Sequence, residues 1–301
     1  MENFLKELSF FFDLLLNGLL TGMLYSLIAL GLVFIYKASG VLNFAQGAMV
    51  LLSGFLVALL INWGVPIWAA VALGAAVMIG MSFVVERMVL RPLVAQPIIS
   101  LIMATLGLTI FIEGLQTFTS NIWPVYTLNI GIPRAPIMLG DIFISPVNVV
   151  GAVIALLLFA GAGYFFMYTR TGMALRAVSD DHEAALSVGV SIKRLWVIVW
   201  GVAGVAAMLA GLIWGSRLSV QASIALLAFK AFPVVIMGGL ESIVGALVAG
   251  LLVGAAENLA AGYLDPYIGG GTKDFFPYFI MLIVLWVRPY GLFGREIIER
   301  V

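Results

Sequence analysis

The sequence predicts an all-α protein, a polytopic bundle of eight or nine transmembrane helices with a short helix on its cytoplasmic surface. The composition is the first reason: 63% of the 301 residues are hydrophobic and only 10% are charged, whereas a soluble domain is about 25% charged. The second reason is a series of stretches without any charged residue, at 14–36, 38–85, 92–112, 142–169 and 195–216. Because a bilayer core about 30 Å thick needs roughly 20 apolar residues per helix, each stretch holds at least one span.

We expect the spans in nine segments, which are separated by charged residues, proline or glycine. The segments are 10–36, 44–62, 66–86, 97–119, 146–168, 195–216, 226–239, 242–260 and 275–288. YKASG ends the first and NWGVP ends the second, since glycine and proline interrupt helices. ERMVLRPLVAQP ends the third with three charges and two prolines. The whole chain, 1–301, is therefore predicted to form a single transmembrane domain.

The seventh segment admits two interpretations. Residues 226–239 make only 14 positions and contain both Lys230 and Pro233. That length is short for a span, so a re-entrant half-helix competes with a full crossing. The link 120–145 contains three prolines and several aromatic residues, and we expect it to form a small extracytoplasmic cap.

The basic residues predict an orientation. If all nine segments cross, ten basic residues lie at the ends that share a side with 169–195, and four lie at the opposite ends. The ten are Lys37, Arg87, Arg91, Arg170, Arg176, Lys193, Arg194, Arg288, Arg295 and Arg300; the four are Lys6, Arg134, Arg217 and Lys273. The positive-inside rule then places 169–195 and the C-terminus in the cytoplasm and the N-terminus outside.

Several function classes are disfavoured by composition. The chain has no cysteine, which removes disulfides and thiolate chemistry, and its one histidine argues against a zinc site or a Ser-His triad. We expect no catalytic residue and no metal site. Zero net charge argues against a nucleic-acid partner. The start, MENFLKELSFFFD, lacks a basic region and a cleavage site, so we expect the first apolar run to be retained as a span.

Charge is concentrated near the middle of the chain. Seven of the 30 charged residues fall within the 25 positions 170–194, around DDHEAALSVG. Asp180 and Glu183 have the spacing of a helix capping pair, and Gly189 suits a left-handed helix stop. We therefore expect a two-turn amphipathic helix on the membrane surface, with Ser191 capping the next span. An ordinary polar loop is the alternative, although two isolated turns are marginal in water and need a neighbour.

Small residues recur at four-residue spacing and predict where helices meet. The three ladders are Gly18, Gly22 and Ser26; Gly211 and Gly215; and Gly250 and Gly254. Such ladders allow close backbone approach within a membrane. Chance spacing is the alternative in a chain with 33 glycines.

Longer motifs resemble a known family. EAALSVG, residues 183–189, looks like the EAA loop of ABC importer permeases, and RTGMALRAVSDDHEAALSVGVSIKRL (170–195) closely resembles that loop in the LivH type of branched-chain amino acid permease. The stretches 18–55 and 228–257 and the ending RPYGLFGR (288–295) resemble the same family. The resemblance covers nearly the whole chain and is weakest in 120–145. The Leu-Pro that often closes the EAA pattern is not found after Gly189.

The resemblance implies a transport subunit of the bacterial plasma (inner) membrane, not an enzyme. Family members work with a second permease subunit of the LivM type, two cytoplasmic ATPase subunits and an external solute-binding protein. The EAA segment is their coupling helix, which implies ATPase contact by Arg176, Asp180, Asp181, Glu183, Ala184, Ala185 and Gly189. The chain has no Gly-x-x-x-x-Gly-Lys-Ser/Thr loop, so we expect ATP and Mg²⁺ on the partner subunits and no cofactor on this chain.

Polar residues inside predicted spans are candidates for the solute path, because charges at the bilayer centre are costly. They are Asn43, Gln46, Glu113, Lys230 and Glu257, and the last two are a plausible pair. Asp13 lies in the first turns of the first span. Helix-end snorkelling, a structural ion pair, or a plain turn at 40–48 are the competing explanations.

Three functional classes remain to be weighed. The first is an ABC importer permease for branched-chain amino acids, with urea, short amides or aromatic acids as alternative cargoes. A secondary transporter or channel is the second, and it would transport without an ATPase. An intramembrane enzyme ranks last, because no nucleophile–base or metal set is present.

Overall fold

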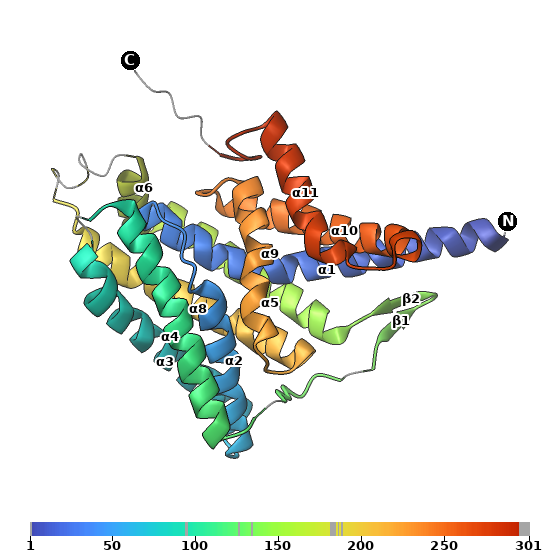
Figure 1. The fold of residues 1–301 in the computed structure, drawn as a ribbon, viewed down its shortest axis with the longest axis horizontal. Coiled ribbons are helices and arrows are strands. Elements are labelled where there is room, and N and C mark those ends of the chain that lie inside the picture. The colour runs from blue at the N-terminus through green and yellow to red at the C-terminus, as the bar shows by residue number, and fades with distance from the viewer. Residues whose placement is uncertain are drawn as a thin grey trace.

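In the computed structural model, residues 2–93, 96–125, 127–133, 135–180, 185, 187 and 189–294 are described. The elements in these parts of the chain are helices, two short helical turns and one hairpin (Figure 1). They are α1 (Glu2–Ser39), α2 (Gln46–Asn62), α3 (Ile67–Val85), the turns η1 (Glu86–Leu90) and η2 (Arg91–Leu93), α4 (Ile98–Ile122), β1 (Ile137–Leu139), β2 (Ile142–Ile144), α5 (Pro146–Tyr168), α6 (Arg170–Asp180), α8 (Ile192–Leu218), α9 (Ser223–Gly238), α10 (Ile243–Ile268) and α11 (Thr272–Val287).

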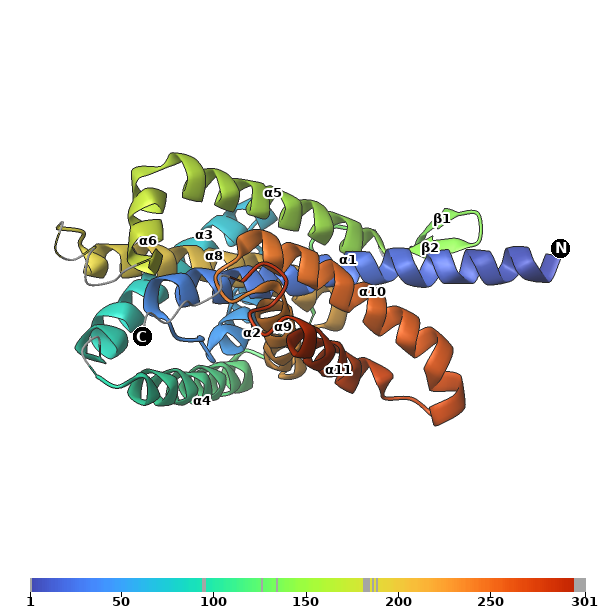
Figure 2. The same ribbon diagram turned by 90° about the horizontal axis from the view of Figure 1, so that it is seen from above.

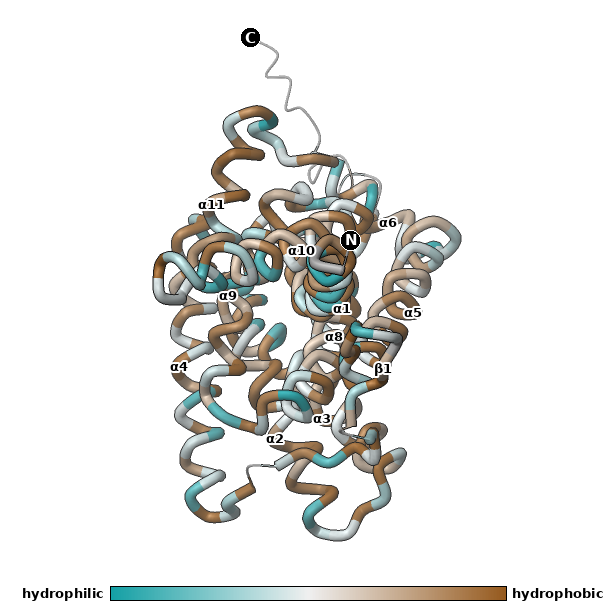
Figure 3. Tube along the Cα trace, turned by 90° about the vertical axis from the view of Figure 1, so that its right-hand side faces the viewer, coloured by the Kyte–Doolittle hydropathy of each residue, from teal (hydrophilic) through white to brown (hydrophobic). Residues whose placement is uncertain are grey.

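Helix α1 is the central element of the bundle. It runs along the long axis of the molecule, and the end-on view shows the other helices arranged around it (Figures 2 and 3). It contacts α10, α8, α5 and α9, and side chains from Leu24 to Ile35 are almost all fully buried. Helices α4 and α11 lie at the periphery and expose many large apolar side chains, as lipid-facing or partner-facing helices do.

Two of the predicted glycine ladders lie at the contact between α1 and α10, a pairing that the spacing alone did not specify. A Cβ on Gly22 would overlap the carbonyl oxygen of Gly250, and one on Gly254 would overlap Gly18 and Gly22. The Ser26 hydroxyl donates to the Gly22 carbonyl at 3.0 Å and lies 3.2 Å from the Ala246 carbonyl. The ladders predicted in α1 and α10 therefore pack against each other, which is the close backbone approach typical of membrane helices.

The remaining ladder also lies at helix contacts. A Cβ on Gly211 of α8 would overlap Val50 and Ser53 of α2, and one on Gly215 would stand 3.1 Å from Leu128. The Ser53 hydroxyl also lies 3.0 Å from the Ala207 carbonyl of α8. Helix α8 is thus fixed to α2 by small residues and to the link between α4 and α5 by Leu128.

Each of the nine predicted spans corresponds to a helix, but not all are long. In the described part of the chain, six helices are long and apolar enough to cross a membrane: Phe4–Ser39, Ile67–Leu93, Ile98–Ile122, Pro146–Tyr168, Ile192–Leu218 and Ile243–Ile268. Helices α2, α9 and α11 have 17, 16 and 16 residues. The predicted count of eight or nine crossings therefore remains a prediction. The re-entrant alternative for 226–239 also remains open, since α9 is short and contains Pro233.

The link 120–145 folds partly into a hairpin that is tied to α1. Strands β1 and β2 are antiparallel, with Ile137 opposite Ile144. The Phe143 amide donates to Asp13 Oδ1 at 2.8 Å, and the Asn17 side chain donates to the Phe143 carbonyl at 2.9 Å. Asp13 and Asn17 therefore bind both backbone groups of Phe143. The end of the bundle with this hairpin is called the hairpin end, and the opposite end, with α6, is called the α6 end (Figure 2).

The charged centre folds differently from the prediction. A helix that was not predicted, α6, covers Arg170–Asp180, and Thr169 caps it: the Gly172 amide donates to Thr169 Oγ1 at 3.0 Å. Asp180 is the last described residue of α6. The predicted capping pair of Asp180 and Glu183 concerns the helix that follows α6, and Glu183 lies outside the described residues, so this pairing stays a prediction.

The end of the next helical segment matches the prediction. Gly189 has φ of 86°, in the left-handed region, and the Val190 amide donates to the Ala185 carbonyl at 3.0 Å. A bond between residues five apart, across a left-handed glycine, is the Schellman helix stop. Ser191 then precedes α8, as predicted, but its side chain makes no capping bond. Asp181, Glu183 and Ala184 lie outside the described residues.

Candidate functional site

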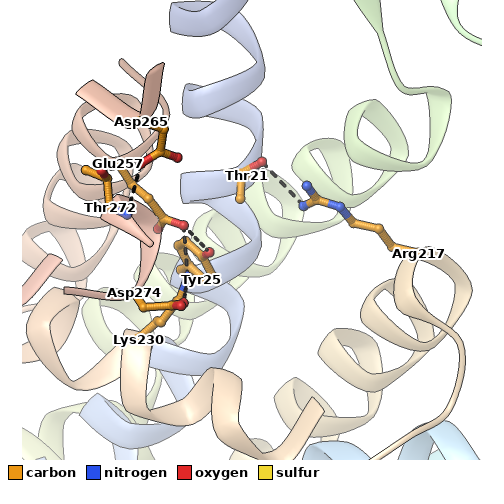
Figure 4. Close-up of polar contacts among 8 residues, drawn as sticks. All are labelled: Thr21, Tyr25, Arg217, Lys230, Glu257, Asp265, Thr272 and Asp274. Atoms are coloured by element: carbon orange, nitrogen blue, oxygen red, sulfur yellow. Dashed lines mark hydrogen bonds and ion pairs between the residues drawn. The ribbon is translucent and has the colours of Figure 1, made fainter. Parts of the chain in front are cut away.

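A buried ion pair lies between α9 and α10, next to the central helix (Figure 4). Lys230 Nζ lies 2.9 Å from Glu257 Oε1, and the Tyr25 hydroxyl donates to the same oxygen at 3.2 Å. Glu257 is 4% exposed, and its Oε2 has no hydrogen-bond partner in the described part of the chain. The sequence-based pairing of Lys230 with Glu257 is thus confirmed, while Tyr25 was not anticipated.

A second carboxylate, that of Asp274, lies near the Lys230 ammonium group. Asp274 Oδ1, in the first turn of α11, lies 3.6 Å from Lys230 Nζ, so one ammonium group serves two carboxylates. The Lys230 side chain is 18% exposed and that of Asp274 is 86% exposed. The exposed parts of Lys230 and Asp274 must face water or another protein chain, because lipid would not solvate their charges.

The backbone before α11 explains how Asp274 arrives there. Gly269, Gly270 and Gly271 all have positive φ, at 85°, 108° and 90°, and make a tight turn after α10. The Thr272 amide donates to Asp265 Oδ1 at 3.1 Å, which fixes the start of α11 to the end of α10. Helix α11 therefore returns beside α9, and its first turn reaches Lys230.

Aromatic rings continue the cluster toward α8. The Tyr25 ring stacks on Trp214 at 5.4 Å between centroids, with 21° between the planes. The guanidinium of Arg217 lies 5.0 Å from the Trp214 ring, and its Nη1 lies 3.3 Å from Thr21 Oγ1. Lys230 Nζ is 5.9 Å from the Tyr25 ring. Two cations thus flank a stacked aromatic pair, an arrangement that cation–π attraction stabilises.

Tyr25 and Glu257 lie near the middle of two helices that are long enough to span a bilayer, which corresponds to mid-depth in the membrane. Tyr25 is the central residue of the uncharged stretch 14–36 in α1, and Lys230 is near the centre of α9, Ser223–Gly238. A carboxylate and an ammonium at that depth are costly unless paired, which explains the short contact between them. We call Tyr25, Trp214, Lys230, Glu257 and Asp274 the mid-membrane cluster. It can bind a charged or zwitterionic solute group or exchange one ion-pair partner for another.

Asn43 and Gln46 are buried at a helix start. Both are fully buried, the Ala45 amide donates to Asn43 Oδ1 at 3.1 Å, and Asn43 Nδ2 lies 3.3 Å from Gln46 Oε1. The Gln46 side chain packs against Gly31 of α1 and lies 3.4 Å from the Ala203 carbonyl of α8. These contacts hold α1, α2 and α8 together. Their predicted place on the solute path remains untested.

Glu113 lies on the peripheral helix α4, away from the mid-membrane cluster. It is half-buried, while Gln116, three residues on, is 8% exposed. Helix α4 packs chiefly on α2, and its other faces are exposed. Within the described residues Glu113 has no hydrogen bond or ion pair, so its predicted place on the path remains a prediction.

The α6 end holds a second polar group of residues. The Ser179 hydroxyl of α6 donates to Glu241 Oε2 at 2.9 Å, and Lys37 Nζ donates to the Glu241 carbonyl at 3.3 Å. Arg176 and Glu241 line an open groove of about 560 Å³ between α1, α5, α6 and α10. Glu241 therefore connects the start of the charged segment to the turn between α9 and α10, a contact that sequence reasoning missed.

The RPYGLFGR ending packs on the same turn. The Leu292 and Phe293 amides donate to the carbonyls of Met237 and Gly238, at 2.8 and 3.1 Å. Gly291 has φ of 80°, and a Cβ there would stand 2.8 Å from the Gly239 nitrogen and the Ile236 carbonyl. These bonds place the last described residues against the end of α9.

The other predicted coupling residues are only partly described. Asp180 is exposed, Ala185 is 3% exposed, and Gly189 is exposed at the helix stop. Asp181, Glu183 and Ala184 lie outside the described residues, so nothing tests their predicted contact with an ATPase.

A bundle of long apolar helices with a buried charged cluster defines a multi-pass membrane protein. A family model described as branched-chain amino acid transport system, permease component, matches residues 14–285. The chain belongs to this family and is of the LivH type, as its motifs indicated. Its relatives are permease subunits of ABC transport systems and not enzymes.

Individual relatives match over nearly the whole chain. The permease LivH of Salmonella typhimurium is 27% identical, over 98% of this chain and 99% of its own. BraD of Pseudomonas aeruginosa, also a high-affinity branched-chain amino acid permease, is 29% identical over 99% and 100%. The ribose import permease RbsC of Escherichia coli is 27% identical over 77% of this chain and 73% of its own.

Proposed function

We propose that this chain is the membrane-spanning subunit of an ATP-driven importer of branched-chain amino acids. The observation that carries the proposal is the near full-length match to LivH and BraD, at 98% and 99% of this chain. The ribose permease covers a smaller share, 77%, which favours amino acids over sugars. Urea, short amides and aromatic acids remain alternative cargoes.

Such a subunit requires partners. A LivM-type permease subunit shares the solute path, two ATPase subunits bind ATP and Mg²⁺ in the cytoplasm, and an external binding protein delivers the solute. The chain resides in the bacterial inner membrane with residues 169–195 and the C-terminus inside, as the basic residues favour.

Residues 169–195 transmit ATPase movement to the bundle. Three described contacts support this role: Thr169 caps α6, Ser179 donates to Glu241, and Gly172 packs so closely on α5 that a Cβ would overlap Phe165 and Phe166. A displacement of α6 is therefore passed to α5 and to the turn before α10. Helix α10 carries Glu257, so the same displacement reaches the mid-membrane cluster.

The solute passes along the face of α9 and α11 that carries Lys230 and Asp274. The support is that the Lys230 side chain is 18% exposed and the Asp274 side chain 86% exposed, since exposed charges within a spanning bundle require water or a second subunit beside them. The rest of this face is apolar, including Leu226 and Phe229. An apolar wall with a few charges suits an amino acid whose side chain is aliphatic.

Reconstitution tests the proposal. Proteoliposomes with this chain, its second permease subunit and the ATPase subunits, supplied with the binding protein, are expected to take up labelled leucine only with ATP. Uptake by this chain alone would support a secondary transporter or channel and refute the importer. An ATPase that does not co-purify with the chain would also refute it.

A further inference from the structure

An apolar groove of about 550 Å³ lies between α5 and α8, away from the proposed solute path. Leu30 and Phe34 of α1 form its floor, and each wall carries a glycine, Gly161 on α5 and Gly201 on α8. No atom stands within 4 Å of a Cβ built on Gly161, and the nearest atom to one on Gly201 is Ile79 Cγ2, at 3.9 Å. The groove is therefore open at its centre.

The groove continues into a basic one at the α6 end. Val197 and Ile198 of α8 line both the apolar groove and a second groove of about 520 Å³. The other residues of the second groove are Arg91, Ser191, Lys193 and Arg194. One surface channel along α8 is thus apolar over most of its length and cationic at its end.

The cations lie where helix electrostatics disfavours them. Lys193 and Arg194 are in the first turn of α8, the positive end of a 27-residue helix, and both are exposed. Neither side chain makes a hydrogen bond or ion pair within the described residues. Arg91 differs, because its Nε and Nη2 bind the buried Glu86 carboxylate at 3.2 and 3.0 Å. A bound anion would offset both the repulsion between these cations and their unfavourable place at the helix start.

The length of the channel matches one leaflet of a bilayer. Val205, at the far end of the apolar groove, comes 11 residues after Arg194. At about 1.5 Å per residue this is about 16 Å along the helix axis. Half of a hydrocarbon core about 30 Å thick is nearly the same distance. A lipid that places its phosphate on the cations would therefore fit its acyl chain into the apolar groove.

We propose that the channel along α8 is a binding site for an anionic phospholipid. The phosphate lies between Lys193 and Arg194, with Arg91 at the edge, and an acyl chain lies over Leu30 and Phe34. An acidic protein surface would satisfy the cations but would leave the apolar groove empty. A zwitterionic lipid would fill the groove without offsetting the charge.

The test uses native mass spectrometry of the full chain, with phosphatidylglycerol and phosphatidylcholine of identical acyl chains. We expect preferential retention of phosphatidylglycerol. The double substitution Lys193→Gln with Arg194→Gln is expected to lower its retention roughly 25-fold, since each basic residue near the surface contributes about fivefold. Gly201→Leu adds a side chain inside the groove, and its Cβ stands no closer than 3.9 Å to another residue, so it is expected to lower retention of both lipids.

Matched controls separate this site from general effects. Lys6→Gln removes a similar exposed charge at the hairpin end, and Gly80→Leu adds the same side chain at an open position of α3 outside the groove. Both are expected to retain lipid like the wild type. Equal retention of the two lipids would overturn the proposal. So would full displacement of the lipid by glycerol phosphate, or a charge variant that loses ATPase binding while keeping its lipid.

Discussion

Lys230 Nζ on α9 lies 2.9 Å from Glu257 Oε1 on α10, although 27 residues separate them in the chain. Tyr25 of α1 donates to the same oxygen, so the contact joins three helices at mid-depth. The pair is both the centre of the proposed path and an attachment of α9 and α10 to the central helix α1.

Removing the cation is expected to destabilise the bundle. In Lys230→Ala, Glu257 would remain 4% exposed with only Tyr25 beside it. An uncompensated buried charge costs about 3–5 kcal/mol, so thermal unfolding in detergent should occur several degrees lower. Lys230→Met combined with Glu257→Met removes both charges and should recover most of the loss. If Lys230→Ala unfolded at the same temperature as the wild type, the pair would contribute no stability.

The contact between α1 and α10 is expected to tolerate no added side chain. Gly22→Val would place its Cβ on the Gly250 carbonyl oxygen. Overpacking of this kind costs about 1–3 kcal/mol or more, and the yield of folded protein in gel filtration should fall. Gly114→Val is the control, since no atom lies within 4 Å of its Cβ. Equal yields from the two variants would refute the contact.

The helix stop at Gly189 is expected to matter for coupling. Gly189→Val forces a β-branched residue into the left-handed region, at about 1–2 kcal/mol. We expect ATP-dependent uptake to fall several-fold while the chain still reaches the membrane. Gly64→Val introduces the same strain, at φ of 83°, in the turn between α2 and α3. A similar loss of uptake in both variants would mean that strain alone, and not the coupling segment, is responsible.

The hairpin is expected to loosen when its attachment to α1 is removed. Asp13→Ala deprives the Phe143 amide of its acceptor, a loss of about 1 kcal/mol. Limited proteolysis within 127–145 should become about fivefold faster, with thermal unfolding of the bundle unchanged. Asp141→Ala, an exposed carboxylate in the turn of the same hairpin, should leave cleavage as in the wild type. Unchanged cleavage in Asp13→Ala would contradict the attachment.

Helix positions were predictable from the sequence because they depend on local composition. YKASG and NWGVP placed the C-terminal ends of α1 and α2 within a few residues, and Gly40 and Gly64 have the positive φ that such breaks need. The spacing of Gly18 and Gly22 with Gly250 and Gly254 indicated close packing, because only small residues allow it. The pairing of Lys230 with Glu257 followed from the cost of charge in a membrane.

Sequence patterns could not predict contacts between residues that lie far apart in the chain. The EAA resemblance drew attention to Asp180 and missed α6, whose start depends on Thr169. Nothing near Ser179 indicates that it reaches Glu241, 62 residues away. The hydrogen bond that Asp13 accepts was equally hidden, because its donor, the Phe143 amide, is 130 residues distant.

The sequence by itself determined that this is a multi-pass helical permease, because apolar length, glycine spacing and family motifs are properties of short segments. Only the tertiary structure decided which charges share a site. Tyr25 and Glu257 are separated by 232 residues, and no local pattern encodes their contact. It arises because glycine ladders bring α1 and α10 close together, and burial at mid-depth then requires each charged group there to find a partner.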